Sequence, residues 1–483
     1  MLRSHMFRLT RQVGALALIV LYAVAMPAHS QATDGPAVPV TPAWSCPQLD
    51  EARFYSDDRY RYIRHGQGEW LFRTQTDLTA LPPVSVAAVE NFARLNRRLA
   101  LSGTRLVISV MPPRGATMRQ FIDLAGLRGQ RFSPDAAMSF YGTTIKRLRG
   151  AGIVATDPLS AAGKSGFVLP GHSLEGASTE FYLSGDPRWT AYGAFVTARA
   201  LRQEISKDPL FSRLTAKRFK TMPAPRQPVI QALRQEAHRI CNSASPREMG
   251  IVYATVATQT TDAGAPSARP GAVTETPARP YLAGGEVVLV GTGSSVYDGA
   301  NFSGFLREEL ATDVANHGIA GGGLSASILS YLSSEDYART KPKFLIWEMQ
   351  YHNLREADDL HLIVGAADGD CGKNALISGA ATPVKLGQTT AFKVASADYS
   401  RIRGPVNAVM DFGKANIRRY HFYLNYSDGT KDRFDIDATR WSHPANKIIV
   451  RVPRDGTELV DISLVLDQRM TGKVSARICR ATA

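Results

Sequence analysis

The sequence predicts an α/β fold with a mostly parallel sheet, followed by an all-β sandwich. Between residues 45 and 360, short apolar runs alternate with amphipathic segments, and polar residues stand where the apolar runs end. This alternation is typical of a parallel sheet with functional groups at the carboxyl ends of its strands. After about residue 365 the pattern changes to short alternating runs separated by turns, which is typical of a sandwich.

The first segment, residues 1–30, is interpreted as a cleavable leader. It begins with three arginines, continues with the apolar run Val13 to Met26 and ends near the small residues of "PAHSQA". This is the order of a secretory signal, and the run is shorter than the roughly 20 apolar residues of a membrane helix. We predict cleavage after Ser30 and export to an oxidising compartment; an uncleaved anchor is the alternative.

Composition and charge narrow the class of protein and its partners. The chain has 483 residues, of which 44% are hydrophobic and 21% charged, as in a globular protein of two or more domains. The formal net charge is +14, and the leader holds three arginines and no acids, so the mature chain keeps +11. An exported basic protein has little access to nucleic acid. An acidic polysaccharide or an anionic membrane face is a more plausible partner for its positive charge. The alternative is that the charge only keeps the protein soluble.

The α/β part is expected over residues 45–360, after a flexible start at residues 31–43. A helix is expected over residues 187–205, where apolar residues recur at helical spacing. Residues 258–280, rich in Thr, Ala, Pro and Gly, are expected to form an exposed loop. Three strands are predicted within "RLVISVMPPRG" (105–115), "GIVATDPLSAA" (152–162) and "KFLIWEMQYHNL" (343–354), leading respectively into a rigid turn, a loop and polar residues.

A further strand, Val287 to Val290, leads through a glycine turn into a helix expected over Asn301 to Leu310. Many hydrolases and acyltransferases carry their nucleophile in such a strand–turn–helix. The turn "GTGSSVYDG" lacks the third glycine of a dinucleotide fingerprint, whose place is taken by Val296, and it lacks the lysine of a phosphate loop. A serine-nucleophile turn remains, which needs a base and an orienting carboxylate.

The cysteines indicate disulfides rather than a metal site. All four lie outside the leader, and in an oxidising compartment they are expected to form two disulfides, for which the sequence alone leaves three pairings open. There is no CxxC and no Cys/His cluster with zinc spacing, so neither a metal nor a cofactor is expected. The four are Cys46, Cys241, Cys371 and Cys479.

Three motifs and the cysteine positions together resemble the alginate O-acetylation proteins of the AlgX/AlgJ type. The motifs are "DPRWTAYGA" (186–194), "VLVGTGSSVYDGANFSGFL" (288–306) and "PKFLIWEM" (342–349). The resemblance covers most of the mature chain. It implies a permuted SGNH hydrolase-like domain, a carbohydrate-binding module at residues 365–483, a periplasmic location, an acidic alginate-like exopolysaccharide as ligand and partners in a periplasmic biosynthetic or secretion complex.

The family's active site uses Asp-x-His and a Gly-x-Ser turn. Asp186 matches the Asp position, but the His position holds Arg188 and the Ser position holds Gly293. A guanidinium stays protonated and takes no proton from a hydroxyl, and glycine has no nucleophile. The resemblance therefore implies a protein that binds the polymer without its triad, in which Asp186 pairs with Arg188 or caps a helix beginning near Pro187.

The alternative is an active O-acetyltransferase or acetylesterase that uses Ser294 or Ser295 as nucleophile, with His352 or His317 as base. One position along the chain displaces the Cα by about 3.8 Å, whereas catalytic geometry tolerates roughly 0.5 Å. A neighbouring serine would need the turn to be rebuilt. Asp186 and Ser294 are the candidate catalytic residues of this alternative.

Two loops of the α/β part are candidate anion sites. Arg114, in "MPPRG" (111–115), is expected to bind a uronate carboxylate through two hydrogen bonds; the alternative is a rigid turn with a solvated arginine. "GIAGGGLSASILSYL" (318–332) is expected to enter a helix from three glycines, whose N–H groups would hold an oxyanion or a sugar carboxylate; a plain loop is the alternative.

The predicted hairpin at residues 418–437 turns at Ser-Asp-Gly-Thr. Arg418, Tyr420 and Phe422 share one face of its first strand and Arg419, His421 and Tyr423 share the other, so one face is expected to be core. The face that mixes rings and cations suits a uronate polymer; a plain basic strand is the alternative. The polysaccharide-binding residues predicted are Arg418, Tyr420, Phe422, Lys431 and Arg433, with Trp441 alongside.

We predict the pairing Cys46–Cys241 and Cys371–Cys479. The first disulfide would tie the start of the α/β part to its middle, and the second would close the β part from end to end. Each closes a loop of over a hundred residues, which in the chain-entropy model stabilises by up to about 4–5 kcal/mol.

Overall fold

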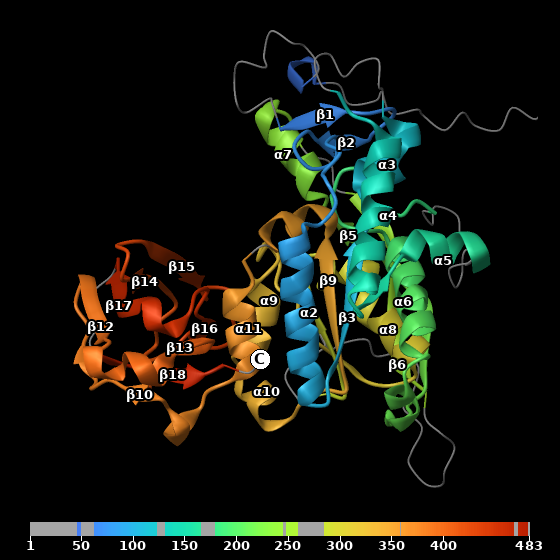
Figure 1. The fold of residues 1–483 in the computed structure, drawn as a ribbon. Helices are drawn as coiled ribbons and strands as arrows, with labels where there is room; N and C mark the ends of the chain where they lie inside the picture. Colours follow the sequence, from blue (N-terminus) through green and yellow to red (C-terminus); the bar gives the residue numbers. More distant parts are fainter. Residues whose placement is uncertain are drawn as a thin grey trace, which may run out of the picture. The chain divides into compact units, whose positions relative to one another are not determined.

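The structure is a computed structural model that describes residues 46–49, 62–122, 131–165, 179–244, 248–258, 285–357, 359–467 and 472–481 (Figure 1). The predicted leader, the predicted flexible start and almost all of the predicted loop at 258–280 lie outside the described residues.

A five-stranded parallel sheet lies at the centre of the α/β part, in the order β4-β3-β9-β7-β8. Every residue of β7 is fully buried, because helices cover both faces of the sheet; this is why its sequence is continuously apolar. The four predicted strands are confirmed, with the bounds β3 Arg105–Met111, β4 Val154–Thr156, β7 Val287–Val290 and β9 Phe344–Gln350; the edge strand β8, Val314–Asn316, was not predicted.

Two layers of helices enclose this sheet (Figure 1). One buried cluster joins one face of the sheet to α2 Val86–Leu101, α4 Pro134–Gly150, α9 Ala326–Leu332, α10 Glu335–Arg339 and α11 His361–Asp368. A second cluster joins the other face to α6 Ala191–Ile205 and α8 Phe302–Leu310. The shorter helices are α3 Arg114–Thr117, α5 Pro158–Ser165, η1 Pro47–Leu49, η3 Arg119–Phe121, η4 Pro209–Arg213, η5 Asp298–Ala300 and η6 Tyr351–Glu356.

Two helical expectations need correction. The helix predicted from residue 187 begins at Ala191, because the Thr190 side chain caps it by accepting from Gly193 N at 3.1 Å. The loop predicted after β4 is the helix α5. The predicted helix after the glycine turn is confirmed as α8, beginning at Phe302.

An antiparallel pair interrupts the α/β alternation and was not predicted. Strand β5 (Phe219–Val229) pairs with β6 (Glu248–Ala257), and helix α7 (Ala232–Ile240) stands between them in the chain. A smaller pair joins β1 (Ile63–His65) to β2 (Leu71–Arg73).

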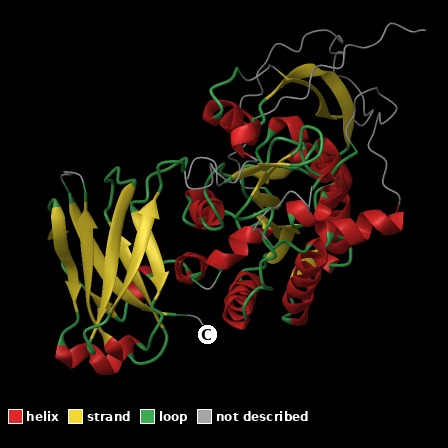
Figure 2. Ribbon diagram, turned by 90° about the horizontal axis from the view of Figure 1, so that it is seen from above, coloured by secondary structure: helices red, strands yellow, loops and turns green. Residues whose placement is uncertain are grey.

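The C-terminal strands form a sandwich of two antiparallel sheets, visible in Figure 2 as the layered group of strands. The predicted hairpin is confirmed as β14–β15, with Phe422 opposite Phe434. One sheet has the order β10-β18-β13-β16 with β11 beside β18, and the other β12-β17-β14-β15. The bounds are β10 Ile377–Ser378, β11 Thr382–Pro383, β12 Gly387–Lys393, β13 Val406–Asp411, β14 Arg419–Tyr426, β15 Lys431–Asp437, β16 Lys447–Arg451, β17 Leu459–Leu466, β18 Lys473–Arg480, η7 Gly372–Asn374, η8 Ser396–Ile402 and η9 Gly456–Glu458.

Helix α11 packs closely on strand β16. A Cβ at Gly365 would lie 2.6 Å from Ile449 O and 2.8 Å from Arg451 N, so only glycine allows this approach. The predicted domain boundary near residues 360–365 falls at this helix and stays a prediction.

Both predicted disulfides are confirmed. Cys46 is bonded to Cys241 with a Cα–Cα distance of 6.1 Å, and Cys371 to Cys479 with 5.8 Å. Within the described residues, one group of three possible metal ligands comes together, namely Asp370, Cys371 and Cys479. Its two sulfurs are consumed by the disulfide, so it offers no thiolate to a metal.

Candidate functional site

The turn after β7 rests on a buried carboxylate from β9. Glu348 is fully buried, and its carboxylate accepts from Thr292 N at 2.7 Å and from the Ser295 hydroxyl at 2.9 Å. Burial raises the pKa of Glu348 despite these hydrogen bonds. The carboxylate therefore fixes the shape of the turn. Sequence reasoning missed this residue, although an acid inside the apolar run "FLIWEM" is a signal that could have found it.

Position 293 is open. Gly293 is half-buried, and a Cβ added there would meet nothing closer than the Ala320 Cβ at 3.7 Å, with the Arg188 Cδ at 3.9 Å. These are ordinary van der Waals distances, so a Cβ at this position would displace no neighbour. The contact with Arg188 also shows that the family's Ser and His positions are adjacent in this chain.

Asp186 is fully buried and holds Arg188 by a two-pronged ion pair. Its carboxylate accepts from Arg188 Nε and Nη2, each at 2.7 Å, and from Arg188 N at 2.9 Å. The predicted pairing is thus present. The predicted cap near Pro187 is wrong, because Thr190 caps α6; Asp186 instead accepts from Ala232 N, in the first turn of α7, at 2.7 Å.

Arg188 fills the place where a base would stand. Its guanidinium carbon lies 4.0 Å from the centre of the Tyr297 ring, and Nη2 donates to Ile230 O at 2.8 Å. Burial alone would lower the pKa of Arg188, but its hydrogen bonds to Asp186 and the charge of that carboxylate outweigh burial and raise it. Arg188 is therefore a permanent cation that cannot accept a proton.

The neighbouring serines face the interior. Ser294 is 0% exposed; its hydroxyl has no hydrogen-bond partner among the described residues, and its carbonyl accepts from Trp189 Nε1 at 3.0 Å. The Ser295 hydroxyl is committed to Glu348. No histidine of the described residues is hydrogen-bonded to either serine, so the geometry does not favour Ser294 as a nucleophile.

The two histidines proposed as bases lie elsewhere. The His317 ring packs 4.8 Å from the Tyr331 ring, centre to centre, and burial lowers the pKa of His317. His352 follows β9 and lines a cleft described below. Burial, followed by the charge of Arg73, lowers its pKa to about 4, so it is neutral at pH 7.

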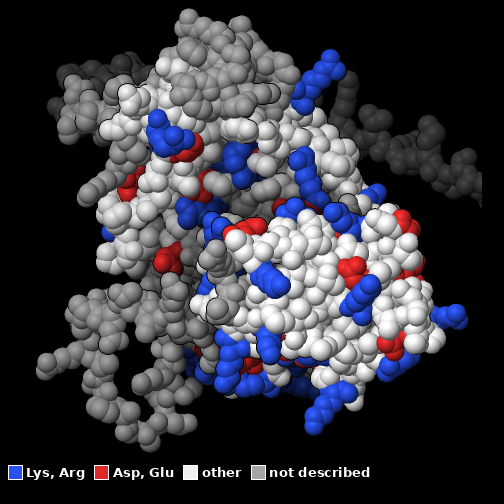
Figure 3. Space-filling model, turned by 90° about the vertical axis from the view of Figure 1, so that its left-hand side faces the viewer, with Lys and Arg blue, Asp and Glu red and all other residues white. Residues whose placement is uncertain are grey.

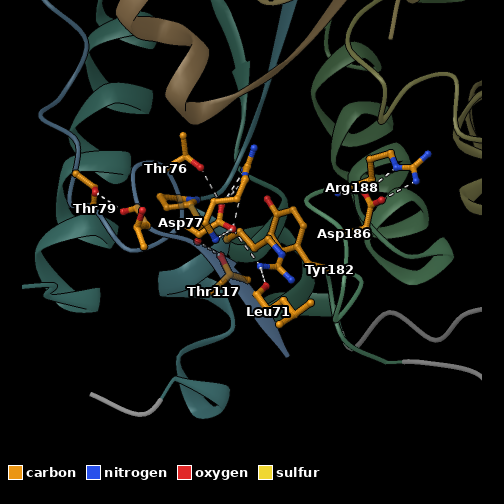
Figure 4. A network of polar contacts seen from close by, with 12 residues as sticks. Leu71, Thr76, Asp77, Thr79, Thr117, Tyr182, Asp186 and Arg188 are labelled. Atoms are coloured by element: carbon orange, nitrogen blue, oxygen red, sulfur yellow. Dashed lines mark hydrogen bonds and ion pairs between the residues drawn. The ribbon is translucent and has the colours of Figure 1, made fainter. Parts of the chain in front are cut away.

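Arg114 is buried rather than solvated, with 4% of its surface exposed. Its guanidinium donates to Leu71 O and Leu183 O at 2.7 Å each and to Asp77 Oδ2 at 3.1 Å. Figure 4 shows Leu71 and Asp77 in this network, with Tyr182 beside them. The alternative of a solvated arginine is wrong, and binding of a uronate by Arg114 stays a prediction that this geometry does not favour.

The glycine loop does not lead directly into a helix. Helix α9 begins at Ala326, three positions after the last of the three glycines, and Ala326 N donates to Gly322 O at 3.2 Å. Leu324 N already donates to the Glu356 carboxylate at 3.1 Å. Just before the three glycines, Ala320 O accepts a hydrogen bond from Arg440 Nη1. These contacts favour the plain-loop alternative.

The predicted binding face of the hairpin, with Arg418, Tyr420 and Phe422, is wrong, because this face points into the sandwich and the opposite face points outward. Tyr420 and Phe422 are 2% and 0% exposed and belong to the core, so they cannot stack on a sugar in the folded protein. Arg418 is half-buried and donates to Ala438 O and Trp441 O. Trp441 is itself buried.

The outward face carries Arg419, His421 and Tyr423 together with the predicted Lys431 and Arg433. Lys431 Nζ lies 4.6 Å from the centre of the Tyr423 ring, and Arg433 pairs with Asp435 at 2.7 Å. Figure 3 shows that the face of the molecule drawn there carries more Lys and Arg side chains than Asp and Glu. Rings and cations thus meet on this surface.

Taken together, the parallel sheet, the strand–turn–helix after β7 and the Asp186 loop beside it define an SGNH hydrolase-like domain followed by a β-sandwich. Residues 63–351 match the family model described as "SGNH hydrolase-like domain, acetyltransferase AlgX". The chain belongs to this AlgX family.

Relatives match over nearly the whole chain. The chain is 26% identical to the alginate biosynthesis protein AlgX of Pseudomonas syringae pv. tomato, covering 99% of this chain and 97% of that protein. It is 27% identical to the probable alginate O-acetylase AlgJ of Pseudomonas aeruginosa, covering 61% of this chain and 71% of that protein. The solved structure of Pseudomonas aeruginosa AlgX superposes with a TM-score of 0.70 at 22% identity, covering 90% of this chain and 99% of that chain, which shows a shared fold.

Among the helices of the described residues, none combines the length and the apolar character needed to cross a membrane.

Proposed function

We propose that this protein acts in the biosynthesis of an alginate-like exopolysaccharide, as a periplasmic protein that binds the acidic polymer without transferring acetyl groups. The names of its relatives, alginate biosynthesis protein AlgX and probable alginate O-acetylase AlgJ, support the pathway. The absence of acetyl transfer is supported by one observation: Arg188, paired with Asp186, lies next to the open position at Gly293.

Two separate losses support the absence of acetyl transfer. A glycine at position 293 offers no hydroxyl to attack an acetyl ester. A guanidinium at position 188 offers no base, and it also neutralises the carboxylate that would orient one. Losing the nucleophile of such a triad costs on the order of a millionfold in rate, which is too slow for a biosynthetic step.

The outward face of the β14–β15 hairpin supports retained polymer binding. Tyr423 offers apolar area for the face of a sugar, and Lys431, Arg433 and Arg419 offer cations for carboxylates. Their present partners, Asp435 and Asp437, are surface acids, and such exposed pairs contribute little to stability. A polymer carboxylate can therefore replace them at low cost.

The proposal is tested on the mature chain, residues 31–483, by calorimetric titration with polymannuronate, a neutral glucan and polyglutamate at two salt concentrations, alongside an acetyl-ester hydrolysis assay. We expect binding to polymannuronate that weakens with salt, weaker binding to polyglutamate, none to the glucan, and no ester turnover. Equal affinity for polymannuronate and polyglutamate would reduce the site to a basic surface, and no polymer binding at all would overturn the proposal.

The active-enzyme alternative has its own readout. An acetyl-ester turnover by the unaltered protein that disappears in Ser294→Ala or Ser295→Ala would establish it. Under our proposal the single variants Gly293→Ser and Arg188→His stay inactive, because each restores one half of the pair. The double variant Gly293→Ser/Arg188→His restores nucleophile and base next to Asp186 and is the one variant expected to gain measurable turnover.

A further inference from the structure

A small cleft opens at the carboxyl ends of β3 and β9, on the side of the Asp186 loop. Its lining includes Arg73, Asp77, Gln350, His352 and Pro187, and its empty space is about 310 Å³ when the part open to solvent is included. Strands β3 and β9 are neighbours, with Met111 opposite Gln350. The cleft thus lies at the edge of the sheet where α/β proteins bind ligands.

The cleft has a positive charge that the protein leaves unbalanced. Arg73 and Arg114 both pair with Asp77, at 2.7 Å and 3.1 Å. Asp77 is the one acid in the described lining, and His352 is neutral at pH 7, as its pKa of about 4 requires. Two guanidinium groups therefore share one carboxylate, and a single positive charge remains.

Three polar groups of the lining have no partner in the described protein. Arg73 uses Nε and Nη2 on Asp77, while its Nη1 makes no hydrogen bond to a described residue. The Gln350 amide and the His352 ring likewise make none among the described residues, although both line the cleft. These three groups are partly exposed, so they are available as donors, and their convergence on one hollow suits a bound group with several acceptors.

We propose that this cleft binds the carboxylate of a single uronate residue, with Arg73 Nη1, the Gln350 amide and the His352 ring as donors; the choice of a uronate rests on the proposed function. A carboxylate carries one negative charge, which matches the one unbalanced positive charge, and its two oxygens accept several hydrogen bonds.

The dimensions of the cleft favour the carboxylate end of the sugar over the whole ring. The hollow is small and part of it is open to solvent, so a carboxylate group fits it and a whole sugar ring does not. The sugar ring would stay outside the hollow. Arg114 keeps a supporting role, because its buried guanidinium holds Asp77 in place while Arg73, with 26% of its side chain exposed, faces the ligand.

The test uses saturation-transfer NMR on the mature chain with two ligands, methyl mannuronoside and methyl mannoside, which differ in one carboxylate. We expect transfer to the mannuronoside alone. Arg73→Gln should weaken that binding about tenfold or more, as expected for the loss of a charged hydrogen bond. Arg97→Gln is the matched control, because it removes one exposed arginine charge from α2, away from the cleft, and should leave binding unchanged.

A second variant guards against a folding defect in Arg73→Gln. His352→Trp leaves both Asp77 pairs intact and fills the cleft, so it should also abolish transfer while thermal melting shows a folded chain. Equal transfer to both sugars, or transfer that persists in Arg73→Gln and His352→Trp, would overturn the inference. Polymer binding without any response to methyl mannuronoside overturns this inference alone, whereas mannuronoside binding without polymer binding overturns the proposed function instead.

Discussion

The turn after β7 and the outward face of the sandwich hairpin hold their charges in opposite ways. At the turn region, Glu348 and Asp186 are buried and each carboxylate is saturated by several donors. On the hairpin, Arg419 and Arg433 form exposed pairs with their cross-strand or same-strand acids. Buried, saturated charges fix the shape of a protein and are closed to ligands, whereas exposed pairs contribute little to stability and can exchange partners. Ligand binding is therefore expected where charge is exposed.

The largest expected effect separates the two faces of strand β14. Tyr420→Ala removes a ring from the sandwich core and should destabilise the protein by about 3–5 kcal/mol. Tyr423→Ala, three positions further along the strand and on its outward face, should cost under about 1 kcal/mol. Urea unfolding of both variants measures the difference, and comparable losses would contradict the assignment of the faces.

The next effect compares a buried carboxylate with an exposed one. Glu348→Ala leaves Thr292 N and the Ser295 hydroxyl without an acceptor and should cost about 2–3 kcal/mol. Asp435→Ala breaks an exposed pair with Arg433 and should cost less than about 1 kcal/mol. Denaturant titration of the two variants measures the loss of unfolding free energy in each. A loss in Asp435→Ala as large as that in Glu348→Ala would contradict the comparison.

The pH dependence of stability reports the buried network at Asp77. Burial alone would raise the pKa of Asp77, but the charges of Arg73 and Arg114 outweigh it and hold the pKa at about 2, below its ordinary value of 3.8. A lowered carboxyl pKa stabilises the folded state above pH 3.8, here by about 2 kcal/mol, and this contribution is lost as the pH falls through about 2.

The stability gap between the unaltered protein and Asp77→Asn should therefore be widest near pH 7 and narrow steadily below pH 4. This difference is obtained by measuring the unfolding free energies of both proteins from pH 7 to pH 2.5. Asp135→Asn serves as the control, because Asp135 is exposed and pairs with Arg119 at the surface; its gap should be small at every pH. A gap at Asp77 that stays constant across this range would contradict the ion-pair assignment.

The smallest effect concerns ligand binding on the outward face. Tyr423→Ala should weaken polymannuronate binding about fivefold, because one stacking surface is lost while Lys431 and Arg433 remain. Calorimetry at fixed salt measures the change, with Val256→Ala, an exposed apolar residue of β6 outside the sandwich, as the control. Undiminished affinity in Tyr423→Ala would place the polymer elsewhere.

The sequence predicted the positions of the α/β site because parallel strands end at a common edge. The strand Val287 to Val290 is continuously apolar, which indicates burial on both faces. The residues that follow this strand therefore lie close to the residues that follow its neighbouring strands. The contact between Gly293 and Arg188 follows from that topology and from the motifs. Asp186 was correctly paired with Arg188, since two positions along a loop bring both side chains within reach.

Other features depend on packing that no local pattern contains. Alternation along β14 divides its residues into two faces, but both faces of this strand carry aromatic residues, so the pattern could not say that Tyr420 is core and Tyr423 is not. Arg114 was misjudged because its partners, Leu71 and Asp77, come from a distant segment. The contact of Asp186 with Ala232 likewise joins residues whose connecting strand pair, β5–β6, the alternating pattern did not predict.

The disulfide connectivity has a consequence for how the chain matures. Cys46 is joined to Cys241 and Cys371 to Cys479, so each cysteine pairs with the next one along the chain. When a chain emerges N-terminus first, Cys241 is the first thiol that Cys46 can meet, and Cys371 appears only after both. Vectorial emergence therefore favours the native connectivity over the other two.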